Sequence, residues 1–526
     1  MNISTIDLSI LIGYFILVFG IGIYVARQTK TGEDLFLGGR SFTWGVIGLS
    51  LFASNISSST IIGLSGAAYT TGIVNSVYEW MSGVPLIIAA VIFVPLYLKA
   101  RITTIPEFLE YRFDVRSRVF FSAVTIIMSV IVELAGGLYA GAMVLSIFFP
   151  SLALWQITVI VAVVAAVYTA FGGLKAVVYT DAIQAVILIV GCSIMTLILF
   201  KEFDYTWANV LTAATEAGKD ANHFSIVRPI DDKALPWPGL LIGVPFLGFW
   251  YWTTNQFIVQ RVLGSKNITH ARWGVLLAGF LKIIPLFLMV IPGAMAISLY
   301  PDIENGDAVF PILMQEVLPV GLFGLVLAGL ISAVMSSVDS ILNSASTLIV
   351  VDFIEPRMEN MDDKTKMNYG RILTFVLMFI AAFLAPQIQH FQSLWDYLQQ
   401  MFSIVVPPVV VIFLVGVFYK RGNGHGSFAA LIGGTLLGIL LFVLSVKGLW
   451  DLHYTMNVGI CILFSTVLFV GVSLATPPPS EQQIAQFTYR KDLLSEGMEG
   501  QPWYLDYRFH SALLVFIMGY ILYLFW

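Results

Sequence analysis

Residues 50–66 read S-L-F-A-S-N-I-S-S-S-T-I-I-G-L-S-G and govern how the rest of the sequence is interpreted. Short polar side chains from Ser54 to Thr60 surround Ile56, within a segment that is otherwise apolar enough to cross a membrane. Serine, threonine and asparagine side chains compete for backbone hydrogen bonds and loosen a helix. Inside a bilayer, loosened backbone is tolerated only where it is buried in protein or lines a wet cavity. The stretch therefore predicts a broken membrane helix beside a site for an ion or a small molecule.

The composition of the chain is that of a membrane protein. Of its 526 residues, 58% are apolar and only 11% are charged, and the mean hydropathy is +0.87. Soluble domains carry about 25% charged residues, and a helix that crosses a bilayer needs about 20 apolar ones. The sequence predicts an all-α polytopic membrane protein with about 14 transmembrane helices.

The basic residues indicate which loops face the cytoplasm. Most of the 27 Lys and Arg residues lie in alternate loops, with clusters at 99–118, 261–272 and 357–371. Cytoplasmic loops carry an excess of Lys and Arg. We therefore expect a multi-pass protein of the inner or plasma membrane whose two termini are both extracytoplasmic.

A second segment has the same mixture of apolar and polar residues. Residues 248–261 read G-F-W-Y-W-T-T-N-Q-F-I-V-Q-R and lie five spans after the first stretch. Interrupted helices at corresponding positions of two halves are typical of transporters built from inverted repeats. We expect one transmembrane domain, 1–526, with a first span at about 7–26, repeats at about 43–200 and 237–420, an outer loop at 201–236, and extra spans at about 425–476 and 508–526.

The sequence contains no pattern typical of an enzyme. There is no nucleotide-binding fingerprint, no P-loop, no metal-ligand spacing and no nucleophile–base arrangement. Cys192 and Cys461 lie in separate apolar spans and are interpreted as small buried hydrophobic residues. We expect no catalytic activity, no bound cofactor and no nucleic-acid partner, and the lipid bilayer as the surroundings.

Residues 333–347, A-V-M-S-S-V-D-S-I-L-N-S-A-S-T, could supply ligands to an ion. Ala333, Ser336, Ser337 and Ser340 share one helical face, which Asp339 adjoins. Their hydroxyl and carbonyl oxygens suit a hard cation such as sodium, and a loosened 50–66 segment would add backbone carbonyls. Packing of small residues between helices is the alternative.

Ionisable residues inside spans are functional candidates, because burying their charge in a bilayer is costly. Lys282 is too central to reach the membrane surface and needs an internal partner or a polar substrate. Glu79 shares a helical face with Ser82, and a Lys, a Glu and an amide around a cavity would suit a polyol, whose hydroxyls donate and accept. Asp181 is either a helix-end carboxylate or part of an ion route, and Glu133 is interpreted as a structural hydrogen-bonding residue.

Two further groups of residues leave alternatives open. Trp250, Tyr251 and Trp252 are either an aromatic belt at the membrane interface or a stacking surface for a ring-shaped solute. Gln399 is either a hydrogen-bonding residue of a site or part of a polar helix end.

Together these segments resemble the sodium–solute symporter family, and within it the sodium/glucose cotransporter branch. The likeness runs from D-L-F-L-G-G-R-S-F-T-W at 34–44 to the last spans. It is carried by S-L-F-A-S-N-I-S at 50–57, Y-E-W at 78–80, T-I-P-E-F-L at 104–109, G-G-L-K-A-V-V-Y-T-D at 172–181, P-W-P-G at 236–239, W-Y-W-T-T-N-Q-F-I-V-Q-R at 250–261, S-K-N-I-T-H at 265–270 and S-S-V-D-S-I-L-N-S-A-S-T at 336–347.

The resemblance implies a LeuT-like inverted repeat of five plus five spans that works by alternating access, with sodium as the coupling ion. The sodium site of the family would fall on Ala53, Ile56, Ala333, Ser336 and Ser337. A second sodium or an exit site would involve Asp181, Ser336, Asp339 and Ser340. The sugar-binding positions would be Asn55, Glu79, Ser82, Tyr251, Trp252, Lys282 and Gln399, with Tyr251 as the inner gate.

Two positions depart from the pattern of the sugar transporters. Thr60, also a candidate solute residue, stands where a longer Gln or His is common, and Gly248 stands where one bacterial member has a ligating Asn. The leading hypothesis is sodium-driven sugar import. The alternatives are a sodium symporter for a polyol, an organic acid held by Lys282 or another metabolite, and a sodium-permeable channel or solute sensor.

Overall fold

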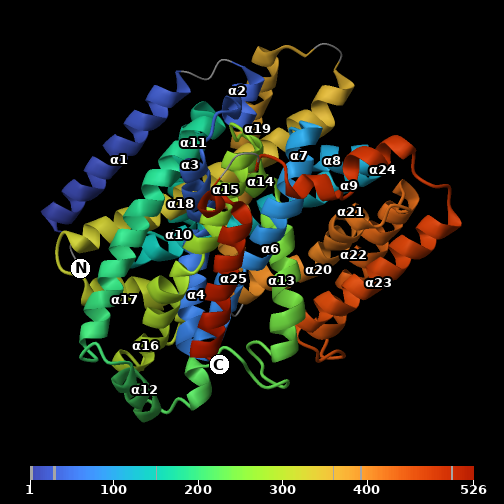
Figure 1. The fold of residues 1–526 in the computed structure, drawn as a ribbon. Coiled ribbons are helices and arrows are strands. Elements are labelled where there is room, and N and C mark those ends of the chain that lie inside the picture. Colours follow the sequence, from blue (N-terminus) through green and yellow to red (C-terminus); the bar gives the residue numbers. More distant parts are fainter. Residues whose placement is uncertain (1–3, 28–30, 150, 359–360, 391–393, 499–501) are drawn as a thin grey trace.

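The structure is a computed structural model, and it describes all residues except 1–3, 28–30, 150, 359–360, 391–393 and 499–501. The described residues form helices and loops without a named strand, as predicted (Figure 1). The first part of the chain contains α1 (Thr5–Ala26), α2 (Gly32–Leu37), α3 (Trp44–Asn55), α4 (Ser58–Thr71), α5 (Val77–Trp80), α6 (Gly83–Ile88), α7 (Val94–Ala100), α8 (Ile105–Arg112), α9 (Val115–Ile127), α10 (Ala135–Phe148) and α11 (Leu154–Lys201).

The second part begins with the outer-loop helix α12 (Trp207–Glu216). It continues with α13 (Trp237–Thr253), α14 (Gln256–Leu263), α15 (Ile268–Leu281), α16 (Ile291–Leu299), α17 (Val309–Val317), α18 (Leu322–Leu348), α19 (Asp363–Leu384), α20 (Leu394–Val410), α21 (Gly416–Phe418), α22 (Gly424–Val446), α23 (Tyr454–Ala475), α24 (Glu481–Phe487) and α25 (Tyr507–Leu524). Single π-helical turns extend several of these, notably η4 (Met128–Leu134) and η8 (Ile349–Ile354).

The described helices do not confirm the expected number of about 14 transmembrane helices. Within the described residues, 10 helices are long and apolar enough to cross a membrane, or up to 11 if α3 and α4 form one bent span. Residues 154–201, which the sequence divides into two spans near Lys175, form one helix. The 17 residues of α13 are too few to cross the hydrocarbon core as a straight helix.

The break in the first stretch is where the sequence predicts it. Helix α3 ends at Asn55, α4 begins at Ser58, and their axes differ by 58°. Ser57 is the N-cap of α4, and its hydroxyl accepts a hydrogen bond from the Thr60 N–H at 3.1 Å. A side chain that caps a new helix start in mid-membrane stabilises the break.

The second predicted interruption is also present. Thr254 and Asn255 separate α13 from α14 with non-helical backbone angles. The Trp250 carbonyl accepts from the Thr254 and Asn255 N–H groups at 3.0 Å, and the Thr254 hydroxyl donates to the same carbonyl at 2.8 Å. Each break therefore has a side-chain hydrogen bond to the local backbone beside it.

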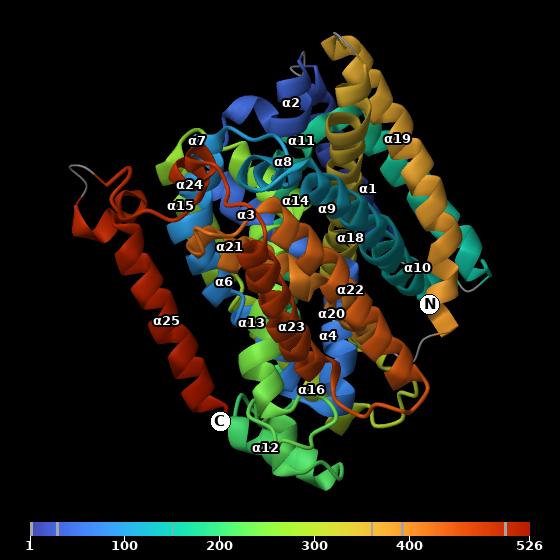
Figure 2. The ribbon, with the colours of Figure 1, turned by 90° about the vertical axis from the view of Figure 1, so that its right-hand side faces the viewer.

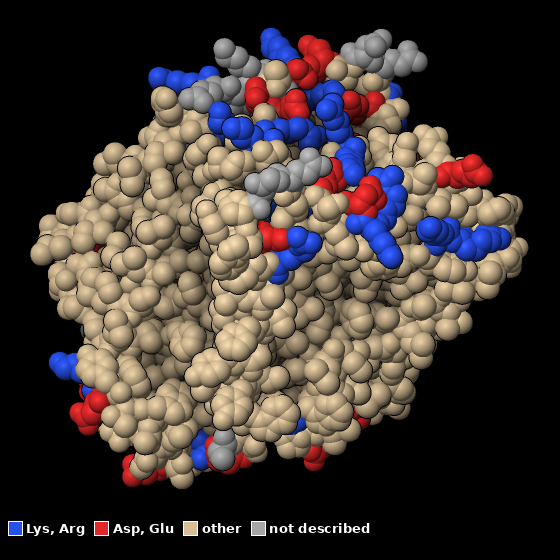
Figure 3. Space-filling model, viewed as in Figure 1, with Lys and Arg blue, Asp and Glu red and all other residues tan. Residues whose placement is uncertain are grey.

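The helices run side by side through the molecule, and most of the visible basic residues gather at one end (Figures 1–3). The visible Lys and Arg side chains concentrate at the end that carries α2, α7 and α8. The C-terminus lies at the opposite end, and α1 runs from its N-terminal end toward the basic end (Figures 1 and 2).

Candidate solute and ion sites

A polar cavity of about 110 Å³ lies beside the two helix breaks. Its wall comes from the α3–α4 break, the α5 region, η4, the ends of α13 and α14, and parts of α18 and α20. All the expected solute residues except Lys282 line it: Asn55, Thr60, Glu79, Ser82, Tyr251, Trp252 and Gln399. The structure thus gathers residues that lie far apart in the sequence around one cavity.

Lys282 lies behind this wall, at the end of α15, and is fully buried. Its ammonium donates hydrogen bonds to Glu79 Oε2 and Asn55 Oδ1. The ring centroid of Trp252 is 5.7 Å from Lys282 Nζ, within range of a cation–π contact. The predicted internal partner therefore exists, and it is a residue of the cavity wall.

Other expected solute residues are also held in place. The Thr60 hydroxyl donates to the Asn55 carbonyl at 2.9 Å, and the Ser82 hydroxyl donates to the Tyr78 carbonyl at 2.9 Å. Trp250 and Trp252 are only 4% and 3% exposed, so they are not a lipid-facing belt. The aromatic cluster is part of the cavity wall.

Glu133 also lines the cavity, although the sequence suggested only a structural role. Its Oε1 accepts from Asn255 Nδ2 at 2.9 Å, and its Oε2 accepts from the Ser129 hydroxyl at 3.1 Å. Within the described part of the chain, no cation is paired with Glu133. The sequence shows that Glu133 is an ionisable residue within a span, but it does not show that this residue lines a cavity.

Two of the expected sodium ligands, Ala53 and Ile56, lie where α3 ends. In an unbroken helix the Ser57 and Thr60 N–H groups would bond to the carbonyls of Ala53 and Ile56. Here the Ser57 N–H donates to the Asn55 carbonyl at 2.8 Å, and the Thr60 N–H donates to the Ser57 hydroxyl. The break therefore diverts the ordinary donors of the two predicted carbonyl ligands.

Helix α18 brings its hydroxyls to the same place. The Ser337 hydroxyl lies 2.9 Å from the Ala333 carbonyl and 3.5 Å from the Ser54 carbonyl in the last turn of α3. Carbonyl and hydroxyl oxygens are the donor set that a hard monovalent cation prefers, so these residues fit sodium as the transported ion.

The second group of expected ion residues contains an arginine that the sequence analysis assigned to a cytoplasmic loop. Asp181 is fully buried and accepts from Ser50 at 2.7 Å, Ser54 at 3.0 Å and Ser336 at 2.6 Å. Arg261, on α14 and fully buried, pairs with Asp181 at 3.0 Å and donates to the Ser340 hydroxyl.

Arg261 is therefore not an exposed loop residue. Its buried charge lies beside residues that were expected to bind a second ion. Asp181, Ser336 and Ser340 come together as expected, and Asp339 on the same helix is 1% exposed. The guanidinium supplies the positive charge that balances Asp181 in this conformation. Burial of Arg261 depends on tertiary packing at the end of a short helix, which the linear sequence does not display.

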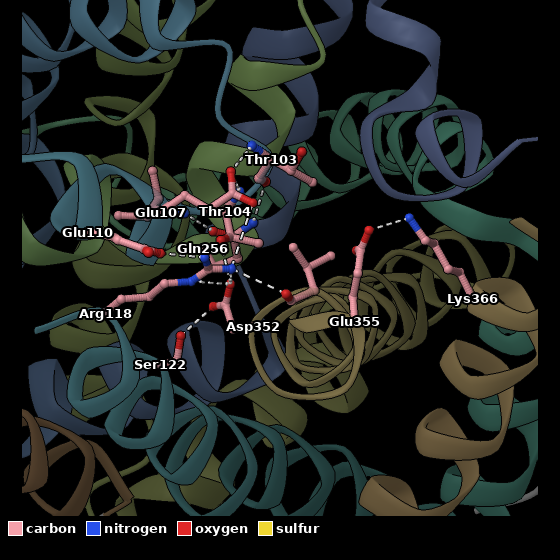
Figure 4. Close-up of polar contacts among 12 residues, drawn as sticks. Thr103, Thr104, Glu107, Glu110, Arg118, Ser122, Gln256, Asp352, Glu355 and Lys366 are labelled. Atoms are coloured by element: carbon pink, nitrogen blue, oxygen red, sulfur yellow. Dashed lines mark hydrogen bonds and ion pairs between the residues drawn. The ribbon is translucent and has the colours of Figure 1, made fainter. Parts of the chain in front are cut away.

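A further polar cluster, the basic-end clasp, lies at the basic end and consists of Thr103, Thr104, Glu107, Arg118, Gln256 and Asp352 (Figure 4). Asp352, on η8, which continues α18, accepts from the Thr104 hydroxyl at 2.9 Å and from Arg118 at 2.7 Å. Gln256, the first residue of α14, accepts from the Ile105 N–H at 2.7 Å and donates to the Thr103 carbonyl at 3.2 Å.

The clasp joins the inner half of the second broken helix to α18 through the loop at 103–105. Burial raises the pKa of Glu107 above its ordinary value, an effect that the Thr103 N–H and the nearby Arg118 oppose. The members of this cluster come from four separate segments, so no sequence pattern marks it.

Comparisons with known proteins agree with these features. Residues 35–434 match the model of the sodium:solute symporter family. The chain is 32% identical to sodium/glucose cotransporter 4 of Danio rerio, over 93% of this chain and 81% of the relative. It is 34% identical to sodium/myo-inositol cotransporter 2 of Homo sapiens, over 94% of this chain and 81% of the relative.

The solved structures include a similar transporter. The substrate-bound, outward-open state of a Na⁺-coupled sialic acid symporter matches with a TM-score of 0.79 and 25% identity, over 91% of this chain and all of that one. The matched family model covers most of the sequence, including both helix breaks. The chain therefore belongs to the sodium:solute symporter family, and it is a sodium-coupled transporter with the LeuT-type fold rather than an enzyme.

Proposed function

We propose that this symporter imports a neutral polyhydroxylated solute, a sugar or a polyol, together with sodium. One observation carries the proposal: the ammonium of Lys282 is already bound to Glu79 and Asn55. None of the described residues that line the cavity is Lys or Arg, whereas Glu79 and Glu133 both line it. A wall with carboxylates and no free cation disfavours an anionic solute.

The remaining wall suits hydroxyl groups. The amide groups of Asn55 and Gln399 can donate to a polyol. The hydroxyls of Thr60 and Ser82 donate to backbone carbonyls and keep lone pairs that can accept from it. Trp252 and Tyr251 offer aromatic surface for the apolar face of a ring. Relatives named for glucose and for myo-inositol transport support this class of solute without separating the two.

The sodium ion is proposed to bind between α3 and α18. Its ligands would be the carbonyls of Ala53, Ile56 and Ala333 and the hydroxyls of Ser336 and Ser337. Each charge carried inward contributes about 2.3 kcal/mol per 100 mV of membrane potential. A second sodium, or a step on the exit route, is assigned to Asp181, Asp339 and Ser340.

Coupling would follow from the position of the break. Sodium would hold the end of α3 against α18, and the solute would complete the cavity on the other side of the same break. Tyr251, at the inner end of the cavity next to the α13–α14 break, would be the inner gate. Residues 43–200 and 237–420 are proposed as the two repeats that move relative to each other in alternating access.

A binding screen with purified protein tests the class of solute. Neutral sugars, myo-inositol and small organic acids are added with sodium and with potassium in its place. We expect neutral polyols to bind in sodium and acids not to bind. Binding of an acid, with neutral compounds inactive, would overturn the proposal and indicate that Lys282 is released to pair with the substrate.

Proteoliposomes test the transport mechanism itself. An inward sodium gradient should concentrate the solute found in the screen above its external level. Solute that only equilibrates would indicate a channel, and binding without uptake would indicate a sensor.

A further inference from the structure

Two aromatic side chains of the cavity wall contact each other. Tyr78 and Trp395 both line the cavity, and their rings meet edge to face with centroids 5.4 Å apart. Tyr78 belongs to α5, one turn within the helical span Ile73–Ala100. Its side chain makes contacts with other elements of the fold, and these contacts help to fix the position of the ring.

One such contact comes from outside the proposed repeats. The hydroxyl of Tyr454, the first residue of α23, lies 2.7 Å from the hydroxyl of Tyr78. The sequence places α23 among the extra spans after residue 420. A helix beyond the repeats therefore reaches the wall of the solute cavity.

Helix α23 is positioned closely enough to act as a fixed support. Helix α23 lies beside α13 (Figures 1 and 2), and two glycines of α13 leave room for the side chain of Thr455. A Cβ on Gly239 would lie 2.1 Å from Thr455 Oγ1, and one on Gly243 would lie 2.5 Å from Thr455 Cβ. His453 Nδ1 caps the same turn at 2.7 Å from Thr455 Oγ1. The residue after Tyr454 is thus seated in a slot on the outer half of α13.

The wall that Tyr454 reaches also contains an unused donor. The indole N–H of Trp395 is buried and has no hydrogen-bond partner among the described residues. A buried donor without a partner is costly, and a rotation of the indole that turns the N–H toward the cavity would let a solute oxygen satisfy it. The exact placement of Trp395, and hence of Tyr78, therefore bears on how well a solute is held.

We infer that Tyr454 is a positioning residue for solute recognition: α23 holds Tyr78, and through it Trp395, by one hydrogen bond between two phenols. The inference rests on the proposed solute cavity. Tyr454 does not line the cavity itself, so it acts through Tyr78. It gives one of the extra spans a role in the affinity of the transporter for its solute.

A double-mutant cycle on the two phenols tests this inference. Tyr78→Phe, Tyr454→Phe and the double variant keep both rings and remove only the hydroxyls. Loss of one hydrogen bond should raise the KM for solute about 2- to 10-fold in each variant. The double variant should be no worse than either single one, with the maximal rate and the KM for sodium unchanged.

A matched control and a stability measurement keep the test decisive. Tyr523→Phe changes a tyrosine that is 78% exposed on α25 and should leave the KM for solute at its wild-type value. Additive effects in the cycle, or an unchanged KM in Tyr454→Phe, would overturn the inference. So would a fall in melting temperature without a rise in KM, which would show that Tyr454 serves folding alone.

The outcome is separable from that of the proposed function. The cycle is measured with whichever solute the sodium-dependent screen returns. An acid substrate would overturn the proposed solute class and leave the cycle valid. A transported sugar with an additive cycle would overturn the role of Tyr454 alone.

Discussion

Lys282 is fully buried, and its charge is balanced by Glu79, a residue of the cavity wall. The pair has two effects on the solute cavity. It cancels one of the two carboxylates there, and it fixes Asn55 and Glu79 in the directions from which they meet a solute. A buried charge pair of this kind is destabilised far more by losing one member than by losing both.

Replacing Lys282 by methionine should therefore abolish solute binding and destabilise the protein by about 3–5 kcal/mol, because Glu79 is left charged and alone. Sodium binding should be largely retained, since the proposed ion ligands lie on α3 and α18. Thermal melting in detergent and solute and sodium binding measure the three quantities.

The double variant Lys282→Met, Glu79→Gln is the control for this effect. It should recover most of the stability, because no buried charge remains, but not the solute binding. Simultaneous loss of solute and sodium binding in a protein that still melts cooperatively would contradict the assignment of Lys282 to the solute site.

For single residues, the sequence predicts a site residue where a polar or charged side chain is unusual for its own segment. A lysine in mid-span and a polar run within an apolar stretch could both be recognised without a fold, and Lys282 and Asn55 do meet. Arg261 could not be recognised, because a basic residue near a predicted loop has an ordinary explanation. Glu133 was visible as a charge in a span, but only the fold shows that its side chain lines the cavity.

The break between α3 and α4 is held open by the side chain of Ser57. Its hydroxyl accepts from the Thr60 N–H and also contacts the hydroxyls of Ser59 at 2.6 Å and Thr60 at 3.0 Å. In a regular helix that N–H would return to the Ile56 carbonyl. The cap thus keeps the Ile56 carbonyl available to an ion.

Ser57→Ala should raise the sodium concentration needed for half-maximal uptake several-fold, because the Thr60 N–H can then occupy the Ile56 carbonyl. The loss of an N-cap costs about 1 kcal/mol, which corresponds to about a 5-fold change. Ser57→Asn supplies another good cap and should stay near wild type. Equal sodium dependence in the Ala and Asn variants would exclude this role for the cap.

The basic-end clasp is a second element whose role can be tested. Gln256 uses both ends of its amide on the backbone at 103–105, and a carboxylate cannot donate to the Thr103 carbonyl. Gln256→Glu should loosen the basic end and increase the labelling rate of a cysteine introduced at Thr103 at least 3-fold over the same cysteine with Gln256 retained.

The native cysteines do not interfere with this measurement, since Cys192 and Cys461 are buried. Addition of sodium should slow the labelling if the ion favours the form in which the basic end is closed. Labelling that is indifferent to Gln256→Glu would show that the loop is held by Asp352 and Arg118 without α14.

For the whole molecule, the distribution of basic residues in the sequence is visible in the fold, whereas a hydropathy window does not show where helices break or continue. A hydropathy window reads length and composition, so it divides residues 154–201 where Lys175 interrupts them, although the backbone there is one continuous helix. The hydropathy window also counts α13 and α14 as one span, although a break at Thr254 and Asn255 separates them. Lys and Arg, in contrast, gather visibly at one end (Figure 3).

The proposed orientation predicts how tags at the chain ends behave. In intact cells a membrane-impermeant reagent should label a tag at either terminus, because both are proposed to be extracytoplasmic. A tag inserted beside Lys364, in a basic loop, should be labelled only after the cells are permeabilised. Labelling of the Lys364 tag in intact cells, with the terminal tags protected, would invert the topology.

Two neighbouring residues at the end of α3 face different neighbours. Ser54 donates to Asp181 at 3.0 Å, and Asn55 accepts from Lys282. Substitutions of Asn55 that broaden the range of solutes will therefore also shift the backbone of its neighbour Ser54. Efforts to redesign this transporter for a new solute should start at Gly248 or Gln399 instead, where solute preference can change without altering the coupling to sodium.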